Sequence, residues 1–289
     1  MVRESLARRF RPAGFEQPEG SRKNYVKPRV ELQEAFDGWV GGLTEQGPDS
    51  YLDDQYRRAC ELVKPIGEIP YREANSLLAG FRPKIDYQSR LGSAQSRAGL
   101  FISACYNQST EPVVIFNLDA PEITLIGYML GKNKVLVNNG EIRSYLAPVS
   151  SGLIVNNKEA GNFLGRDSSG VVVNNGHTGG WFIDSESPGI FIDLQKPSSL
   201  EQIVKGGRFL RSEHFHKIPD LKKYFEELCE ATRTIKDEDS AKRFLEIYGP
   251  EPRERIEQDI DKILKRELGY WNRMKRGIGY ILKNGGFTF

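Results

Sequence analysis

Apolar residues follow a helical spacing in the first part of the chain. Between residues 29 and 98 they recur at intervals of three and four, which is typical of amphipathic helices with one buried stripe. The first stripe consists of Leu32, Ala35, Phe36, Trp39 and Val40. A second helix is predicted from Tyr51 to Val63, and a third short one after Pro70. We therefore expect a helical segment over 29–98.

The pattern changes between residues 99 and 197. Runs of four to six Val, Ile, Leu and Phe residues alternate there with Gly, Asn, Ser and Asp, as expected for short strands joined by turns. The runs are LFISA, PVVIFNL, ITLIGYML, KVLVNN, GLIVNN, GVVVNN and GIFIDL. LFISA, at 100–104, is predicted to be the first of these strands.

Helical spacing returns after Pro197. One helix is predicted to start at Pro219, because proline is favoured in the first turn. A longer one is predicted from Pro252 to about Lys283, with its Lys and Arg side chains opposite the apolar stripe. Residues 1–30 hold eight Lys and Arg against three Glu. We expect a mobile basic arm over 1–28, a β domain over 99–197 and a C-terminal helical segment over 198–289.

The β domain contains a repeat of 18 residues. The segments 134–151, 152–169 and 170–187 align without gaps, so that the dipeptide Asn-Asn recurs as 138–139, 156–157 and 174–175. A second column reads Met129, Tyr145, Phe163 and Trp181, with Leu130, Leu146, Leu164 and Phe182 beside it. This alignment treats IGYMLG, at 126–131, as an earlier partial copy.

Such a repeat predicts a β-solenoid, in which each coil lies about 4.8 Å above the last and column mates become neighbours. Apolar columns would fill the interior, and stacked Asn side chains would form hydrogen-bonded ladders. The fold class is therefore α+β: a single-stranded β-helix of about four 18-residue coils, flanked by N- and C-terminal helical segments. A hexapeptide helix is excluded, because steps of six from Leu136 give Ile142 and then Pro148.

The segment AGNFLG, between GLIVNN and GVVVNN, resembles the glycine repeats of the GXGXG family over about residues 113–195. That family includes the C-terminal domain of the glutamate synthase large subunit and a component of formylmethanofuran dehydrogenase. The resemblance implies a right-handed β-helix. It also implies a structural role beside catalytic domains, which would make this chain a scaffold or one part of a larger complex.

Composition restricts the remaining possibilities. The 41 Lys and Arg nearly balance the 39 Asp and Glu, which argues against bulk capture of nucleic acid. The three cysteines are odd in number and lack C-x-x-C spacing, so we expect a reduced, cytoplasmic environment. No apolar run approaches the ~18 residues that a membrane span requires.

Candidate chemistry is confined to a few residues. The candidate binding residues are His177, Arg208, Arg211, His214 and His216. The pair His214 and His216 would share one face of a strand, but nothing in the sequence brings His177 near them. We therefore assign no metal, no cofactor and no catalytic residue. Cys105 is expected to be a buried, inert thiol.

Three functions remain open. The leading hypothesis is a non-catalytic β-helix scaffold that docks a protein partner in a larger intracellular complex. The second is an enzyme or a protein that binds a small molecule near His177, His214 and Arg208. The third is a nucleic-acid-binding module that uses the basic arm and the basic side of 262–283.

Overall fold

The computed structural model describes residues 26–41, 51–79, 81, 93–178, 187–193, 208–211 and 219–273. The chain forms two compact units, divided between Thr110 and Glu111. Most of the predicted arm lies outside the described residues. Its last part is fastened, because the Val26 N–H donates to Ser76 Oγ at 3.2 Å.

The first unit is helical, as the apolar spacing predicts. Its elements are α3 (Val30–Gly41), α4 (Tyr51–Val63), the 3-10 helix η1 (Lys64–Ile66), α5 (Tyr71–Ala79) and α6 (Ala94–Gln108). Leu32 and Phe36 of the first predicted stripe are buried. The three predicted helices are confirmed.

The predicted strand LFISA is wrong, because these residues lie inside α6. Ser93 caps this helix by accepting a hydrogen bond from the Ser96 N–H. Every residue from Gln95 to Tyr106 is buried. A helix buried on all sides has no polar face, so its short apolar runs look like those of a buried strand.

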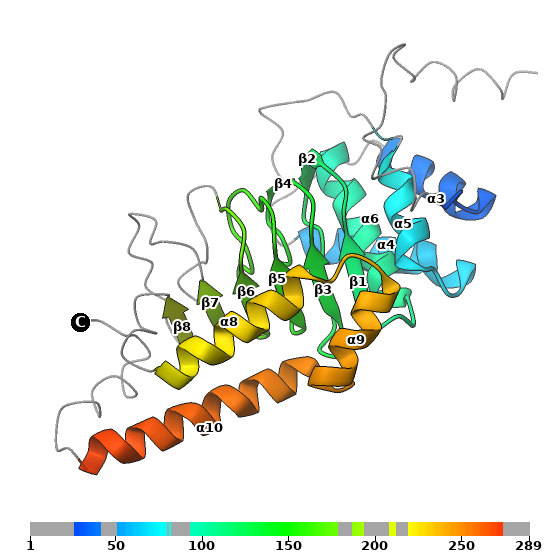
Figure 1. Ribbon diagram of the computed structural model, residues 1–289. Coiled ribbons are helices and arrows are strands. Elements are labelled where there is room, and N and C mark those ends of the chain that lie inside the picture. The colour runs from blue at the N-terminus through cyan, green and yellow to red at the C-terminus, as the bar shows by residue number, and fades with distance from the viewer. Residues whose placement is uncertain are drawn as a thin grey trace, which may run out of the picture. The chain divides into compact units, whose positions relative to one another are not determined.

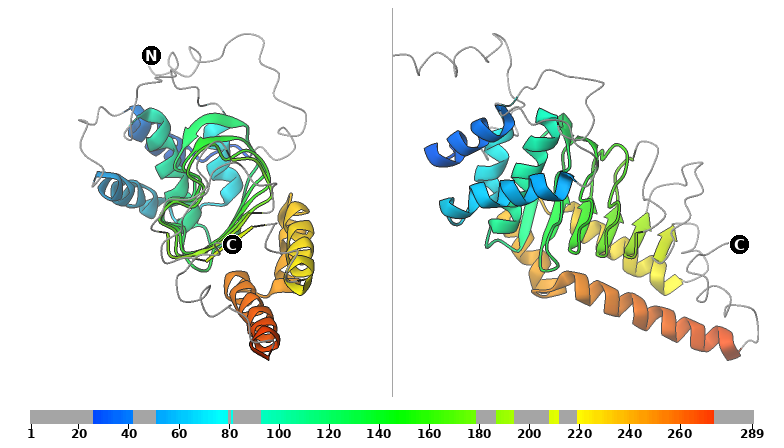
Figure 2. Two further views of the ribbon diagram at one scale, coloured as in Figure 1. Left: turned by 90° about the vertical axis from the view of Figure 1, so that its left-hand side faces the viewer. Right: turned by 180° about the vertical axis from the view of Figure 1, so that it is seen from behind.

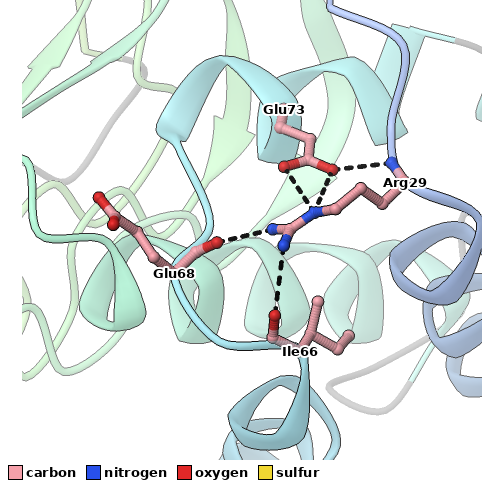
Figure 3. Close-up of polar contacts among 4 residues, drawn as sticks. All are labelled: Arg29, Ile66, Glu68 and Glu73. Carbon is pink, nitrogen blue, oxygen red and sulfur yellow. Dashed lines mark hydrogen bonds and ion pairs between the residues drawn. The ribbon is translucent and has the colours of Figure 1, made fainter.

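A buried carboxylate fastens the start of the described chain in this unit (Figure 3). Glu73 of α5 accepts hydrogen bonds from the Arg29 N–H at 2.7 Å and from Arg29 Nε at 3.0 Å. The guanidinium also donates to the carbonyl oxygens of Ile66 and Glu68. Since both charges find partners, the burial of Glu73 is compensated.

The second unit contains a parallel β-solenoid of about four turns, flanked in sequence by helices (Figure 1). One sheet has the order β1-β3-β5-β6-β7-β8, and a second pairs β2 with β4. The strands are β1 (Val113–Phe116), β2 (Ala120–Thr124), β3 (Val135–Asn138), β4 (Ile142–Ser144), β5 (Leu153–Asn156), β6 (Val171–Asn174), β7 (Ile190–Asp193) and β8 (Arg208–Arg211). The predicted fold class is confirmed.

The 18-residue repeat sets the strand register. Val135 pairs with Leu153, and Leu153 pairs with Val171. The first coil is longer, because Val113 pairs with Val135. Part of the extra length is absorbed at the register shift between Ala120 and Thr124. The rest lies near the turn that precedes β3.

This longer coil makes the predicted column of Met129 with Tyr145 wrong. The Ala147 N–H donates to the Ile126 oxygen, and the Gly165 N–H donates to the Leu146 oxygen. Ile126, Leu146 and Leu164 therefore share a column, and Leu125 takes the position that the alignment gives to Met129. The predicted neighbours Trp181 and Phe182 lie outside the described residues.

Apolar side chains and one amide ladder fill the coil interior. A Cβ on Gly127 would meet Leu136 Cδ2, so Leu136 points inward. Two residues on, Asn138 Nδ2 donates to Asn156 Oδ1 at 2.8 Å, and Asn156 Nδ2 donates to Asn174 Oδ1 at 2.8 Å. Asn174 in turn donates to Asp193 at 3.0 Å. The predicted Asn ladder is confirmed and ends on a carboxylate.

Three helices follow the solenoid: α8 (Pro219–Arg233), α9 (Glu238–Tyr248) and α10 (Pro252–Arg273). Figures 1 and 2 show α8 running across the strands of the larger sheet. The start of α10 is attached to two coils, since Arg253 donates to the carbonyl oxygens of Ser151 and Ser169. The predicted starts at Pro219 and Pro252 are confirmed, and the predicted helix beyond residue 273 lies outside the described residues.

Asn156 provides a test of the inner ladder. Asn156→Ala removes the acceptor of Asn138 and the donor to Asn174, and each buried amide group without a partner costs about 1–3 kcal/mol. We expect the free energy of unfolding, measured by urea titration, to fall by about 2–4 kcal/mol. Lys158→Ala, at an exposed position in the same coil, should change it by less than ~0.5 kcal/mol. Equal losses in both variants would contradict the ladder.

Candidate functional site

The three candidate binding residues that the structure describes, His177, Arg208 and Arg211, lie on different parts of the solenoid. His177 is exposed and forms a β-bridge with Glu159 of the preceding coil. Arg208 and Arg211 are the end residues of β8, and His214 and His216 lie outside the described residues. Within the part of the chain that the structure describes, no three His, Cys, Asp or Glu side chains are grouped to hold a metal.

His177 ends a column of acidic residues, with one member on each coil. Asp119, Glu141, Glu159 and His177 follow one another in register, because Ala120 pairs with Ile142 and the Ala160 N–H donates to the His177 oxygen. Asp119, Glu159 and His177 are exposed. We call Asp119, Glu141 and Glu159 the acidic column. Within the described residues, none of the three forms an ion pair.

A pair of stacked rings lies four residues further along each coil. The rings of Tyr145 and Phe163 have centroids 4.8 Å apart and planes inclined by 18°. The Arg166 guanidinium lies 5.7 Å from the Phe163 ring and 5.9 Å from the Tyr145 ring. Both rings are half-buried. We call Tyr145 and Phe163 the aromatic column.

The backbone at these rings has an unusual conformation. Tyr145 has a φ of 55° and Phe163 a φ of 61°, in the left-handed region that normally favours glycine. Every second residue repeats this on three coils, with Gly127 and Met129 after Leu125, Ala147 and Val149 after Tyr145, and Gly165 and Asp167 after Phe163. The alternation turns the chain through the corner of the coil.

Two aromatic residues in this conformation are costly. A left-handed conformation costs about 1–2 kcal/mol for each L-residue with a side chain. A stacked aromatic pair returns about 0.5–1.5 kcal/mol beyond the area that it buries. The stack alone offsets only part of the backbone cost, and the buried ring area and the Arg166 contacts add to it. Glycine would fit the corner with less backbone strain. Tyr145 and Phe163 thus occupy positions whose left-handed backbone conformation disfavours large side chains.

The stacking also restricts what the rings can bind. Their planes are nearly parallel, so each ring covers one face of the other. Arg166 is close to both rings. Sugars and unpaired bases bind to free aromatic faces. Besides the remaining ring surface, this flank offers the carboxylates of the acidic column and the basic side chains of Arg143 and Lys158.

The second Asn of each repeat binds a helix. Asn139 Nδ2 donates to the Ile235 oxygen at 2.7 Å, just beyond the end of α8. Asn157 Nδ2 donates to the Thr232 oxygen at 3.1 Å. Asn175 is hydrogen-bonded to Thr232 Oγ1 at 3.1 Å and to Cys229 Sγ. From coil to coil the contact moves back along α8 by about three residues.

This step follows from two fixed lengths. Three residues of an α-helix rise about 4.5 Å, and neighbouring coils are about 4.8 Å apart. A helix parallel to the solenoid axis therefore presents an equivalent surface to each coil. The three Asn residues also bond to one another, since Asn157 donates to Asn139 and Asn175 donates to Asn157, each at 2.9 Å.

The cysteines are poorly suited to nucleophilic chemistry. Burial raises the pKa of the Cys229 thiol to about 11 and also raises the pKa of Cys105 and Cys60. A raised pKa lowers the fraction of thiolate, which is the reactive form. The prediction that Cys105 is buried is confirmed.

The described part of the predicted basic helix face is largely paired with acids. Lys262 Nζ lies 3.6 Å from Asp259 Oδ1, and Arg266 forms an ion pair with Asp220 of α8. Lys265 is exposed, and the side chains of Arg273, Arg276 and Lys283 lie outside the described part of the chain. The nucleic-acid hypothesis gains no support from the paired part.

Sequence reasoning missed the acidic column, although the aligned repeats contain its signal. Glu141, Glu159 and His177 occupy one column of the three 18-residue segments. The attachment of α8 to Asn139, Asn157 and Asn175 had no such signal, because a polar outward column is equally typical of a solvent-exposed ladder.

Comparison of the chain with known proteins found no matching family model, no matching curated protein and no matching solved structure. The resemblance to the GXGXG family stays a prediction. Among the described helices, none combines the length and the apolar character that crossing a bilayer requires.

Thr232 provides a test of the attachment of α8. Thr232→Val removes the hydroxyl that accepts from Asn175, and a lost hydrogen bond of this kind costs about 1 kcal/mol. We expect the amides of α8 to exchange with solvent roughly fivefold faster, as measured by native-state hydrogen exchange. Thr234→Val, at an exposed threonine bonded only within its own turn, is the control and should leave the exchange unchanged.

Phe163 provides a test of the backbone cost. Alanine is normally more stable than glycine in regular structure by about 0.5–1 kcal/mol. We expect the opposite order here: Phe163→Gly should exceed Phe163→Ala in free energy of unfolding by about 1 kcal/mol, because glycine relieves the left-handed strain. Urea titration of both variants measures the difference. The normal order would contradict the strain.

Proposed function

We propose that this protein is a non-catalytic β-solenoid scaffold that docks a protein partner in a larger complex. The docking surface is the flank formed by the acidic and aromatic columns. The observation that carries the proposal is the stacked pair of Tyr145 and Phe163, held in left-handed backbone on adjacent coils. Rings kept at a cost to the fold are explained by a contact outside the fold.

The chemistry of the flank favours a protein over other ligands. The stack covers one face of each ring, which reduces the ring area open to the stacking of sugars and bases. Half-buried aromatic residues beside a guanidinium are a frequent composition of protein interfaces. The free carboxylates beside them provide charge that a partner would match.

The position of the flank also supports docking. In Figure 1, β2 and β4 lie on the far side of the coils from α8 and α10. The larger sheet is covered by the chain's own helices, so partner binding falls to the opposite flank. The resemblance to GXGXG domains, which are structural elements beside catalytic domains, agrees with a scaffold role.

Phe163→Gly tests the proposal, because it removes a ring and keeps the corner conformation. The full chain and the variant would be used to capture partners from the cells that make the protein, with quantitative mass spectrometry as the readout. We expect the variant to bind the specific partner at least tenfold more weakly, which corresponds to about 1.4 kcal/mol of binding free energy. The captured amount of that partner should fall accordingly.

Ile247→Ala is the matched control, since Ile247 is 69% exposed on α9. Figure 1 shows α9 on the other side of the coils from β2 and β4. It should leave the captured partner unchanged. If Phe163→Gly captured the same proteins in the same amounts as the unaltered chain, the flank would not be the docking surface.

A further inference from the structure

The contact between the outer Asn residues and α8 shows how this solenoid binds a helix. The outer Asn residues contact α8 near positions 235, 232 and 229, about one turn for each coil. The match depends only on the rise of an α-helix and the spacing of the coils. Any column of the solenoid has that same spacing, whatever side chains it carries.

The docking flank has two such columns. Glu141 and Glu159 are one coil apart, as are Tyr145 and Phe163. Glu159 and Phe163 are separated by four residues of one coil, which span at most ~14 Å. A helix with its side chains is about 10–12 Å wide. One helix parallel to the axis can therefore contact both columns.

An extended peptide fits this flank poorly. Side chains on one face of a strand recur every two residues, or about 6.6–6.8 Å. Coils recur about every 4.8 Å, so a strand along the axis would lose register within two coils. Helix side chains three or four residues apart lie about 5–6 Å apart and stay in register.

Charge specifies the helix further. The acidic column stacks three carboxylates on successive coils, and like charges in directly opposite positions are unfavourable. The flank also carries Arg143, Lys158 and Arg166, but none of these is repeated in register on the next coil, whereas the acidic column is continuous. A partner helix with Lys or Arg once in each turn would neutralise the acidic column.

We propose that this flank binds one helix of a protein partner, parallel to the solenoid axis. The helix presents Lys or Arg every three or four residues to Asp119, Glu141 and Glu159, and an apolar side chain to Phe163. This inference rests on the proposed function and names the chemistry of the partner.

Photo-crosslinking of the full chain tests the helix. A benzophenone amino acid is introduced at Ser144 in one variant and at Asn162 in another, which are column mates on adjacent coils. The partner residues that crosslink are then mapped by mass spectrometry. We expect two positions three or four residues apart, within a segment that carries Lys or Arg at the same spacing.

The outcomes separate the two proposals. Partner residues one or two positions apart, or in unrelated segments, would overturn the helix and leave protein docking intact. Crosslinks to this chain's own residues or to nucleic acid would overturn the helix as well. The proposed function would fall with it only if Phe163→Gly also captured the partner unchanged.

A charge-reversal variant tests the acidic column directly. Glu141→Lys with Glu159→Lys should weaken binding of the crosslinked partner at least tenfold, with a smaller loss at high salt because salt screens the interaction. Glu246→Lys with Glu254→Lys makes the same charge change at two exposed helix positions and should leave binding unchanged. Equal weakening by both double variants would overturn the role of the acidic column.

Discussion

The spacing of the coils, about 4.8 Å, governs the second unit of this protein. Parallel strands at this distance bring identical residues of successive coils into hydrogen-bonding range. The amides of Asn138, Asn156 and Asn174 use that distance inside the coil. The amides of Asn139, Asn157 and Asn175 use it outside, where one turn of α8 has nearly the same length.

The buried amides allow only one register between neighbouring coils. A buried amide is costly without partners and nearly neutral with them, so a ladder favours only the register in which all its members pair. Asp193 closes the inner ladder by accepting from Asn174. A slip by one residue would place valine beside asparagine and leave donors unpaired. The interior thus opposes any register other than the observed one.

Much of this architecture could be predicted from the sequence. The gapless repeat gave the register of β3, β5 and β6 and the partners in both Asn columns. The first coil could not be predicted, because its extra residues shift the register inside the coil. The helix at 100–104 resembles a strand in the sequence, because burial on all sides removes the polar face that distinguishes the two.

The flank with the acidic and aromatic columns was harder to predict for a different reason. Tyr145 and Phe163 align in the sequence, but their left-handed backbone is a property of the corner and leaves no mark in composition. The contact between Asn139 and Ile235 joins residues 96 positions apart in the chain. Outward polar columns look alike in a sequence whether water or a helix covers them.

The attachment of α8 to successive coils ties the lengths of two distant segments together. A further coil, inserted by duplicating 18 residues of the solenoid, would move every later coil by about 4.8 Å along α8. Its outer Asn would then need a partner one turn further toward the start of the helix, near Glu226. Such a protein would grow in whole steps, with 18 residues in the solenoid matched by three in a helix elsewhere in the chain.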